Sequence, residues 1–268
     1  MQFALKKLAT EALKKLDLRL ARYSYIQSLE GSAKLGSLME MLLKERYTQN
    51  VRLGMQDDGL LRALRNSQSQ LGQDIFVLLE RGFATAGYFV EFGAANGVSL
   101  SNTYLLEKEF GWRGIVAEPA ARWQQDLKGN RNCHIESKCV WRDSNSVLTF
   151  NEADEGEYST IDAFRSSDIH YQMRTRGTNY SVTTLSLEDM LNKYNAPRSI
   201  DYLSIDTEGT EFEILSAFDF SKYEFRVITC EHNFSQQRDK IFSLLTENGY
   251  SRLFEKLSRF DDWYVRGT

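Results

Sequence analysis

The sequence predicts an α/β fold in which helices cover both faces of a mainly parallel sheet, preceded by a helical N-terminal extension. From Gly72 onward, short runs rich in β-branched and aromatic residues alternate with helical runs, which is typical of βαβ units. One of these runs, residues 88–92, passes straight into the small-residue loop 93–97 and then into a helical stretch. Before residue 67 the apolar residues instead recur at helical spacing.

The extension is predicted to span residues 1–66, and the α/β domain residues 67–268. Residues 1–22 predict an amphipathic basic helix whose leucine stripe docks on its own domain or on a second subunit. A membrane-surface role is the alternative interpretation. Two further helical patterns follow, at residues 36–47 and 57–65, with turns near Gly31 and Gly54. A homo-oligomer that assembles through these helices is therefore one hypothesis.

The alternating pattern also predicts the elements of the α/β domain in order. Strands are expected at residues 88–92, 114–118, 133–140, 200–206 and 225–231. Helices are expected at residues 99–110, 120–127, 187–194 and 212–218. Two short runs, 147–150 and 158–161, predict a hairpin inserted before a polar stretch at residues 165–179. The chain is expected to end in two strands, 250–254 and 261–265, joined by a charged turn.

The composition indicates an ordinary globular protein and argues against several classes of function. Hydrophobic residues make up 42% and charged residues 26% of the chain. With 33 Lys and Arg against 37 Asp and Glu, the protein has no polycationic surface, so nucleic acid is not an expected partner. No apolar run is long enough to span a bilayer, and Cys133, Cys139 and Cys230 are too scattered for a disulfide framework. These features predict a cytoplasmic protein without a transmembrane segment.

The loop that follows residues 88–92 predicts a nucleoside site. Gly93 and Gly97 would let the loop backbone approach a ligand closely, and the next helix would offer unpaired N–H groups to it. Glu91 stands two residues before the loop, where its carboxylate could accept a hydrogen bond from a ligand ammonium. Glu118 ends the next strand, about the separation from the loop at which an acidic residue reaches ribose hydroxyls. Either carboxylate alone could be an ordinary surface acid, but the pair around a glycine loop favours a nucleoside.

Seven short segments between Ser69 and the C-terminus stand out: residues 73–76, 89–97, 101–103, 111–114, 116–119, 204–211 and 231–233. The most specific contains Asp206-Thr207-Glu208-Gly209-Thr210-Glu211. Together they resemble the FkbM family of methyltransferase domains. The resemblance implies a Rossmann-like, seven-stranded class I methyltransferase sheet, S-adenosylmethionine as methyl donor, and O-methylation of sugars or other hydroxyl-bearing metabolites. It implies that the cofactor is bound by Glu91, Gly93, Ala94, Asn96, Gly97, Ser99, Asn102, Glu118, Pro119 and Asp206.

Two of the later strands end in carboxylates, which predicts the chemical part of the site. Asp206 and Glu231 should point into the same crevice, because parallel strands share a carboxyl edge. His232 is the predicted general base, with Asp206 or Glu231 orienting it or accepting the proton instead. Alternatively, Mg²⁺ or Mn²⁺ held by Asp206, Glu231 and Glu208 would lower the pKa of a bound hydroxyl. Some of this acidity could simply favour the start of a helix.

These observations predict an S-adenosylmethionine-dependent O-methyltransferase that acts on a hydroxyl of a sugar, glycan or related metabolite. The insertion at residues 147–180 is expected to shape the acceptor pocket. Two alternatives stay open, a nucleotide-sugar or NAD enzyme on a similar sheet and a non-catalytic interaction module that keeps the fold. The loop spelling Gly-Ala-Ala-Asn-Gly disfavours the first, because a dinucleotide site prefers G-x-G-x-x-G. The retained carboxylates disfavour the second.

Overall fold

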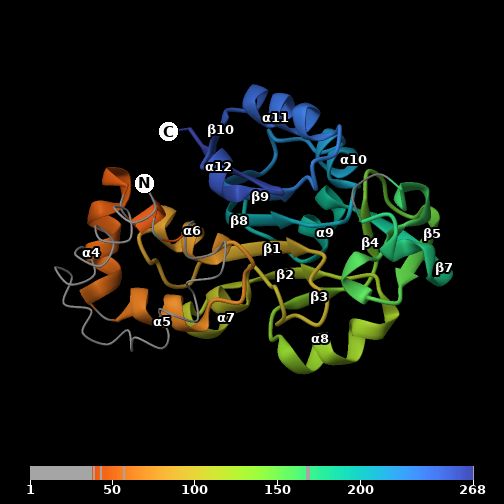
Figure 1. Cartoon of the computed structure of the whole chain (residues 1–268), viewed down its shortest axis with the longest axis horizontal. Coiled ribbons are helices and arrows are strands. Elements are labelled where there is room, and N and C mark those ends of the chain that lie inside the picture. The colour runs from red at the N-terminus through yellow and green to blue at the C-terminus, as the bar shows by residue number, and fades with distance from the viewer. Residues whose placement is uncertain (1–37, 39, 43, 57, 167–169, 268) are drawn as a thin grey trace.

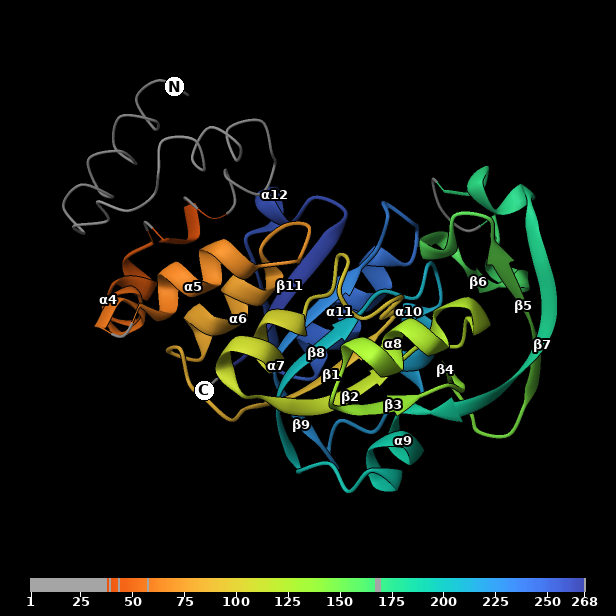
Figure 2. The same cartoon turned by 90° about the horizontal axis from the view of Figure 1, so that it is seen from below.

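The structure, a computed structural model, describes residues 38, 40–42, 44–56, 58–166 and 170–267. A seven-stranded sheet forms its centre, and a second sheet of four strands lies beyond one end of the first (Figure 1). The described N-terminal helices lie at the opposite end of the molecule (Figure 2). The central sheet therefore has the described N-terminal helices at one end and the small sheet at the other.

The elements have the following bounds. The strands of the large sheet are β1 (Tyr88–Phe92), β2 (Arg113–Ala117), β3 (His134–Glu136), β8 (Ser199–Ile205), β9 (Glu224–Glu231), β10 (Tyr250–Leu253) and β11 (Asp261–Arg266). Those of the small sheet are β4 (Cys139–Trp141), β5 (Val147–Ala153), β6 (Thr160–Ile161) and β7 (Gly177–Ser186). The α-helices are α4 (Thr48–Gln56), α5 (Gly59–Asn66), α6 (Gln73–Glu80), α7 (Tyr104–Phe110), α8 (Gln124–Asn130), α9 (Leu187–Lys193), α10 (Glu211–Ser216), α11 (Arg238–Glu247) and α12 (Glu255–Ser258). Short 3₁₀ turns are η1 (Glu45–Tyr47), η2 (Ala121–Trp123), η3 (Gly156–Tyr158), η4 (Asp162–Phe164) and η5 (Met173–Thr175).

The strand order of the large sheet places a ligand crevice at its centre. The order is β10-β11-β9-β8-β1-β2-β3, and β11 runs antiparallel to both of its neighbours. The first strand of this sheet along the chain is the central strand β1. Strands β2 and β3 follow on one side of it, and β8 pairs with its other side. Connections from β1 and β8 therefore leave in opposite directions, which opens a crevice at their carboxyl ends. The predicted α/β fold with a seven-stranded Rossmann-like sheet is confirmed.

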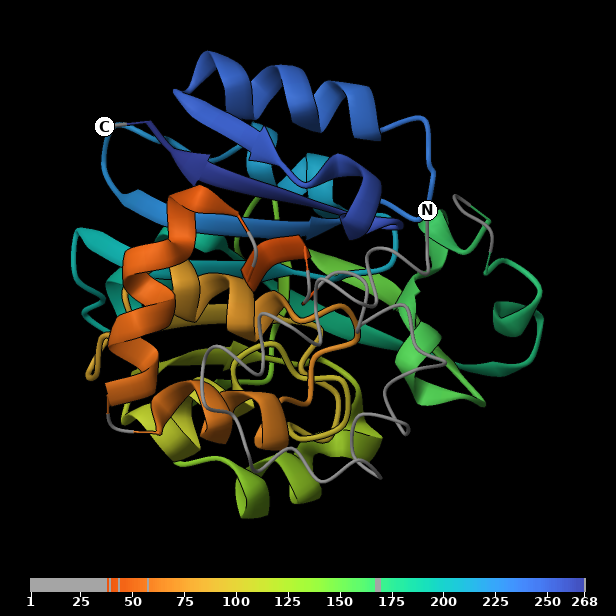
Figure 3. The ribbon, with the colours of Figure 1, turned by 60° about the vertical axis from the view of Figure 1, so that its left-hand side comes forward.

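Alternate residues of β1 face two different apolar layers. Phe89 packs into the layer that includes α5, α6 and α7, whereas Val90 packs into the layer of α9, α10 and α11. This alternation is the expected result of a strand that is buried on both sides. Figure 3 views the molecule from the end with the N-terminal helices and shows α11, in blue, along one face of the sheet. The sheet thus lies between two layers of helices, as predicted.

The structure corrects several predicted boundaries. The single strand expected at 133–140 is two strands, β3 and β4, which belong to different sheets. The helix expected at 99–110 begins only at Tyr104, because the residues before it bind Glu91 with their side chains and backbone. Helix α6 and strand β7 were not predicted, and Gly54 lies inside α4 rather than at a turn. Most residues of β7 are Thr, Ser or Asn, so the strand lacks the apolar alternation that identifies one.

The hairpin of the insertion and the C-terminal strands are confirmed. Strands β5 and β6 pair in antiparallel fashion with Phe150 opposite Ile161, and β7 pairs along the other edge of β5. Strands β10 and β11 pair in the same fashion, with α12 in the charged turn between them. The small sheet has its own apolar core, which includes Phe150, Ile161 and Trp141. The insertion is therefore a folded layer rather than a loose loop.

The described part of the N-terminal extension shares a core with the α/β domain. Leu38 and Met41 are buried in the same apolar cluster as Phe76 and Trp263. The helix predicted at 36–47 is interrupted, since a 3₁₀ turn follows Lys44. The amphipathic helix predicted at 1–22 lies outside the described residues, and the domain boundary near residue 66 stays a prediction.

Within the described ranges, no helix combines the length and apolar character needed to cross a bilayer. Cys133, Cys139 and Cys230 are all free thiols. The cytoplasmic location and the absence of a nucleic-acid partner stay predictions.

Candidate active site

A cleft lies between the carboxyl edge of the large sheet and the small sheet. It encloses about 880 Å³, open solvent included, and Phe150 and Ile161 of the small sheet form part of its wall. Eight of the predicted site residues line it: Glu91, Gly93, Ser99, Asn102, Glu118, Pro119, Asp206 and Glu208. Five others do not: Ala94, Asn96, Gly97, Glu231 and His232. The cleft is thus at the crevice that the strand order creates.

The glycines of the loop after β1 are required by the protein's own packing. Gly93 has φ +73°, and a Cβ atom on it would lie 1.8 Å from the backbone oxygen of Asp206. Gly97 has φ +80°, and its Cβ would lie 2.6 Å from Leu127 Cδ1 and 2.7 Å from Arg131 Cγ. Real Cβ atoms do not approach other atoms so closely, and L residues rarely adopt these dihedrals. The space beside these two glycines, which was predicted to admit a ligand, is therefore already taken by protein atoms at the ends of β8 and α8.

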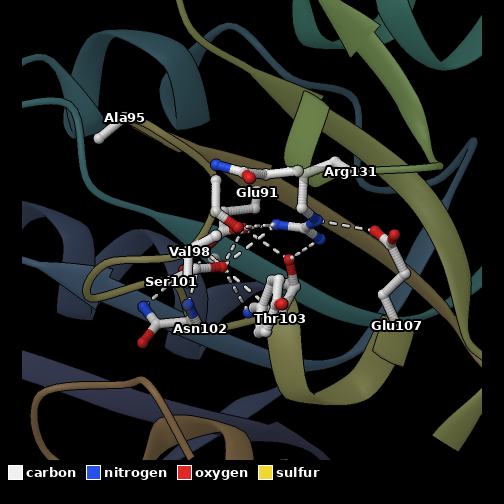
Figure 4. A network of polar contacts seen from close by, with 12 residues as sticks. Glu91, Ala95, Val98, Ser101, Asn102, Thr103, Glu107 and Arg131 are labelled. Atoms are coloured by element: carbon white, nitrogen blue, oxygen red, sulfur yellow. Dashed lines mark hydrogen bonds and ion pairs between the residues drawn. The ribbon is translucent and has the colours of Figure 1, made fainter. Parts of the chain in front are cut away.

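Glu91 organises the loop that follows Gly97 (Figure 4). Its carboxylate accepts hydrogen bonds from the Asn102 amide at 2.7 Å, the Thr103 hydroxyl at 2.5 Å and the Ser101 hydroxyl at 3.0 Å. Only 3% of its surface is exposed. Both carboxylate oxygens thus have protein donors, and the structure assigns Glu91 to holding this loop. Contact with a ligand ammonium stays a prediction.

Arg131, which follows α8, completes this network and was not predicted. Its guanidinium is fully buried and contacts Glu91 at 3.3 Å, Glu107 at 2.7 Å and the Thr103 hydroxyl at 2.8 Å. The two carboxylates come from β1 and α7, so one cation joins three elements. Nothing in the sequence marks this arginine, because its partners are 24 and 40 residues away.

Asn96 and Asn102 have structural contacts of their own. The Asn96 side-chain oxygen accepts hydrogen bonds from the amides of Val98 and Ser99, each at 2.9 Å. Asn102 donates to the Ser204 hydroxyl at 2.9 Å, which ties the loop to β8. Asn96 therefore stabilises the turn from within, whereas Asn102 lines the cleft and remains available as a predicted cofactor contact.

Glu118 lies at the end of β2 with its carboxylate against two loops. Its two oxygens accept hydrogen bonds from the amides of Ala95 and Ala120, each at 2.8 Å. Burial raises the pKa of this carboxyl to about 7, with smaller contributions from Glu152 and Asp206, although the two amides oppose the shift. The charge of Glu118, which is predicted to bind the nucleoside, therefore changes with pH near neutrality.

Replacing Glu118 with glutamine is expected to weaken binding of S-adenosylhomocysteine by about 1 to 3 kcal/mol, because a charged acceptor for the ribose is lost. In the wild type, affinity should rise about tenfold between pH 6 and pH 8, as Glu118 loses its proton around pH 7. In Glu118→Gln this rise should disappear. Calorimetric titration across that range measures both effects.

The matched control is Glu136→Gln, which makes the same change at the end of the neighbouring strand β3, outside the cleft. It should keep the wild-type affinity and pH dependence. Equal affinity in wild type and Glu118→Gln would remove Glu118 from the cofactor site.

Asp206, Glu208 and Glu231 form a compact carboxylate cluster. Each offers one oxygen, and these three atoms all lie within 4.8 Å of one another. Burial, followed by the charges of Asp206 and Glu208, raises the pKa of Glu231 well above its usual range, and Glu231 shares a hydrogen bond with Asp206. The raised pKa favours a proton shared between Glu231 and Asp206. The structure brings these residues together as predicted, while their roles stay predictions.

His232 does not join this cluster, and the geometry disfavours its role as general base, which stays a prediction. Its Nδ1 accepts a hydrogen bond from the Phe234 amide at 3.0 Å, and its Nε2 faces Asp262 Oδ1 at 3.8 Å. In the sheet, the residue that pairs with Glu231 is Asp261, whereas His232 faces the next residue, Asp262. Neighbouring residues of a strand face opposite sides, so Glu231 and His232 point apart. Burial lowers the pKa of His232 to about 4, which keeps it neutral.

Two residues that were not predicted as site residues bind the cluster. Arg174 from η5 contacts Glu208 at 2.5 Å. The side-chain amide of Asn233 donates to Glu231 at 2.7 Å and to Glu208 at 3.2 Å. The alternative interpretation, that nearby acids only start a helix, holds for Glu211, whose carboxylate accepts the amides of Thr207 and Gly209.

The fold and the cleft define the class of protein. A Rossmann-like sheet in this strand order, with a glycine loop after its central strand and acidic residues at the ends of β2 and β8, is that of the class I methyltransferases. The family model described as "Methyltransferase FkbM domain" matches residues 91–252. The chain therefore belongs to the FkbM methyltransferase family, whose methyl donor is S-adenosylmethionine.

Comparison with solved structures returns further methyltransferases at low identity. Methyltransferase FkbM from Methylobacillus flagellatus KT is 12% identical, with a TM-score of 0.41 over 81% of this chain and 62% of that chain. Precorrin-6y C5,15-methyltransferase from Geobacter metallireducens GS-15 is 12% identical, with a TM-score of 0.39 over 75% of this chain and 89% of that chain. The present chain thus spans less than two thirds of the first of these proteins. No curated protein matches the sequence.

Proposed function

We propose that the protein transfers a methyl group from S-adenosylmethionine to a hydroxyl of a sugar, glycan or related metabolite. The observation that carries the proposal is the position of Asp206. Its carboxylate follows β8 at the centre of the crevice, beside the loop at Gly93, and lines the cleft. A group placed there can accept a proton from an acceptor hydroxyl next to the donor.

The cleft has the features that the cofactor requires. Glu118 offers charged acceptor oxygens for ribose hydroxyls, and Pro119 and Asn102 lie on the same wall. When bound, S-adenosylmethionine would supply an electrophilic methyl group on a sulfonium. The residues of the chain then orient the hydroxyl and hold its proton, with Asp206 as the base. Glu231, whose pKa is raised by burial and by the neighbouring carboxylates, shares a hydrogen bond with Asp206 that helps to orient it.

The small sheet supports an acceptor rich in hydroxyl groups. Its part of the cleft wall combines apolar Phe150 and Ile161 with polar Glu157, Ser159 and Thr160. Such a mixture suits a sugar, which has an apolar face and many hydroxyls. The chain belongs to a family for which sugar O-methylation is the expected chemistry, and the insertion 147–180 is the proposed acceptor pocket.

The predicted divalent metal does not fit the cluster. Oε2 of Glu208 and Oε2 of Glu231 already accept hydrogen bonds from Arg174 and Asn233, and a metal ion bound to these atoms would have to displace those donors. Mg²⁺ and Mn²⁺ prefer several oxygen ligands that are free to coordinate. We therefore assign no step of the reaction to a metal ion.

The test is incubation with S-adenosylmethionine labelled at the methyl carbon and a panel of monosaccharides, glycans and small metabolites. We expect label in a hydroxyl-bearing product as an ether, which is stable to mild alkali. Label released as methanol by mild alkali would identify an ester and contradict the proposed O-methylation of a hydroxyl. Label on nitrogen or carbon would contradict it equally.

A further inference from the structure

We propose that Arg174 supplies the positive charge for the cluster of Asp206, Glu208 and Glu231, in place of a divalent metal ion. In this role it is a positioning residue. This inference rests on the proposed function for its effect on turnover, but not for its effect on metal binding. Arg174 lies in the connection between β6 and β7, which was predicted only as a polar stretch.

The contacts of Arg174 show that its side chain is part of the site. It is fully buried, although Met173 and Thr175 beside it are exposed. Its Nη2 contacts Glu208 at 2.5 Å, and its Nε donates to the backbone oxygen of Tyr158 at 2.8 Å. A guanidinium presents several donors in a fixed plane, so it can join a carboxylate to two backbone segments at once. Arg174 thus links the β6–β7 connection to Glu208, which follows β8.

The charge of the cluster requires such a cation. Three carboxyl groups lie within 4.8 Å of one another, and Glu208 and Glu231 are almost fully buried. Buried carboxylates at this spacing cannot all be ionised without a counter-charge. Arginine keeps its positive charge at any ordinary pH. The guanidinium on Glu208 offsets one of these negative charges inside the cluster.

The same contacts compete with a metal ion. Arg174 and Asn233 both donate to Oε2 of Glu208, and Asn233 also donates to Oε2 of Glu231. A divalent cation bound to these oxygens would have to displace both donors, and a cation anywhere in the cluster would meet the positive charge of Arg174 at close range. The cluster should therefore become a metal site only when Arg174 is removed.

The experiment titrates the full-length protein with Mn²⁺ alone and follows binding by calorimetry. We expect no binding by the wild type up to about 1 mM Mn²⁺, and binding by Arg174→Ala at least tenfold tighter, since exposed carboxylates then provide the oxygen ligands. Arg176→Ala is the matched control, because Arg176 is exposed in the same connection and its removal changes the net charge equally. It should behave as the wild type, and so should Arg174→Lys, which keeps a cation. Circular dichroism confirms that each variant is folded.

Tight Mn²⁺ binding by the wild type would overturn the proposal, and that result needs no variant to fold. Metal binding by Arg176→Ala equal to that of Arg174→Ala would overturn it as well. In the transfer assay, Arg174→Ala should lose turnover, and guanidinium ion or Mn²⁺ should restore part of it, which a purely structural defect would not allow. If the wild type methylates no acceptor, the proposed function fails while the Mn²⁺ titration still decides the role of Arg174.

Discussion

Replacing Asp206 with asparagine is expected to lower turnover by about 100-fold to 10,000-fold at saturating S-adenosylmethionine, because the proposed base is lost. The amide has the size of the carboxylate but cannot take a proton from an acceptor hydroxyl. Initial rates with methyl-labelled cofactor measure the effect, and affinity for S-adenosylhomocysteine is measured separately so that weaker binding is not mistaken for slower transfer.

The control for this experiment is His232→Gln. Glutamine is polar and close to histidine in length, and His232 does not line the cleft. Turnover should therefore stay within a few-fold of the wild type. A large loss in His232→Gln with a small loss in Asp206→Asn would reverse the assignment of the base.

Gly93→Ala is expected to destabilise the protein by at least about 3 kcal/mol, from the left-handed backbone and a steric clash together. Gly93 has φ +73°, and the new Cβ would lie 1.8 Å from the backbone oxygen of Asp206. Strands β1 and β8 would have to separate at the crevice. Chemical unfolding measures the loss of stability, and titration with S-adenosylhomocysteine measures the loss of affinity that should accompany it.

Gly111→Ala separates the two contributions. Gly111 has φ +66°, close to that of Gly93, but no atom lies within 4 Å of the position of its Cβ. This variant should lose only about 1 to 2 kcal/mol, the cost of the left-handed conformation for an L residue. If both variants were destabilised equally, the close approach of β1 and β8 would not be the reason that Gly93 is a glycine.

The sheet could be predicted from the sequence because its signal is local. The runs at β1, β8 and β9 are rich in aromatic and aliphatic residues, and most of their positions are buried, which is typical of strands covered on both faces. Strand β7 lacks this signal, because most of its residues are polar and its first five are exposed or only partly buried. Helix α6 was missed because its apolar residues are nearly continuous and show no helical alternation.

The site could be predicted only in part, for a related reason. Asp206 and Glu231 end neighbouring parallel strands, so their meeting follows from topology alone. His232 was assigned to the same crevice from its position in the sequence, but strand alternation turns it away. Arg131 and Arg174 bind carboxylates 24 to 40 residues away, and no spacing rule connects such pairs. Buried arginines that hold a site together are visible only in three dimensions.

The network around Glu91 means that the loop after β1 has its shape before any cofactor arrives. Its hydrogen bonds run to Ser101, Thr103 and Arg131, all within the protein. The conformational entropy of these residues is therefore lost when the chain folds, and the binding step does not have to supply it. We therefore expect the loop to bind the cofactor with little rearrangement of its backbone.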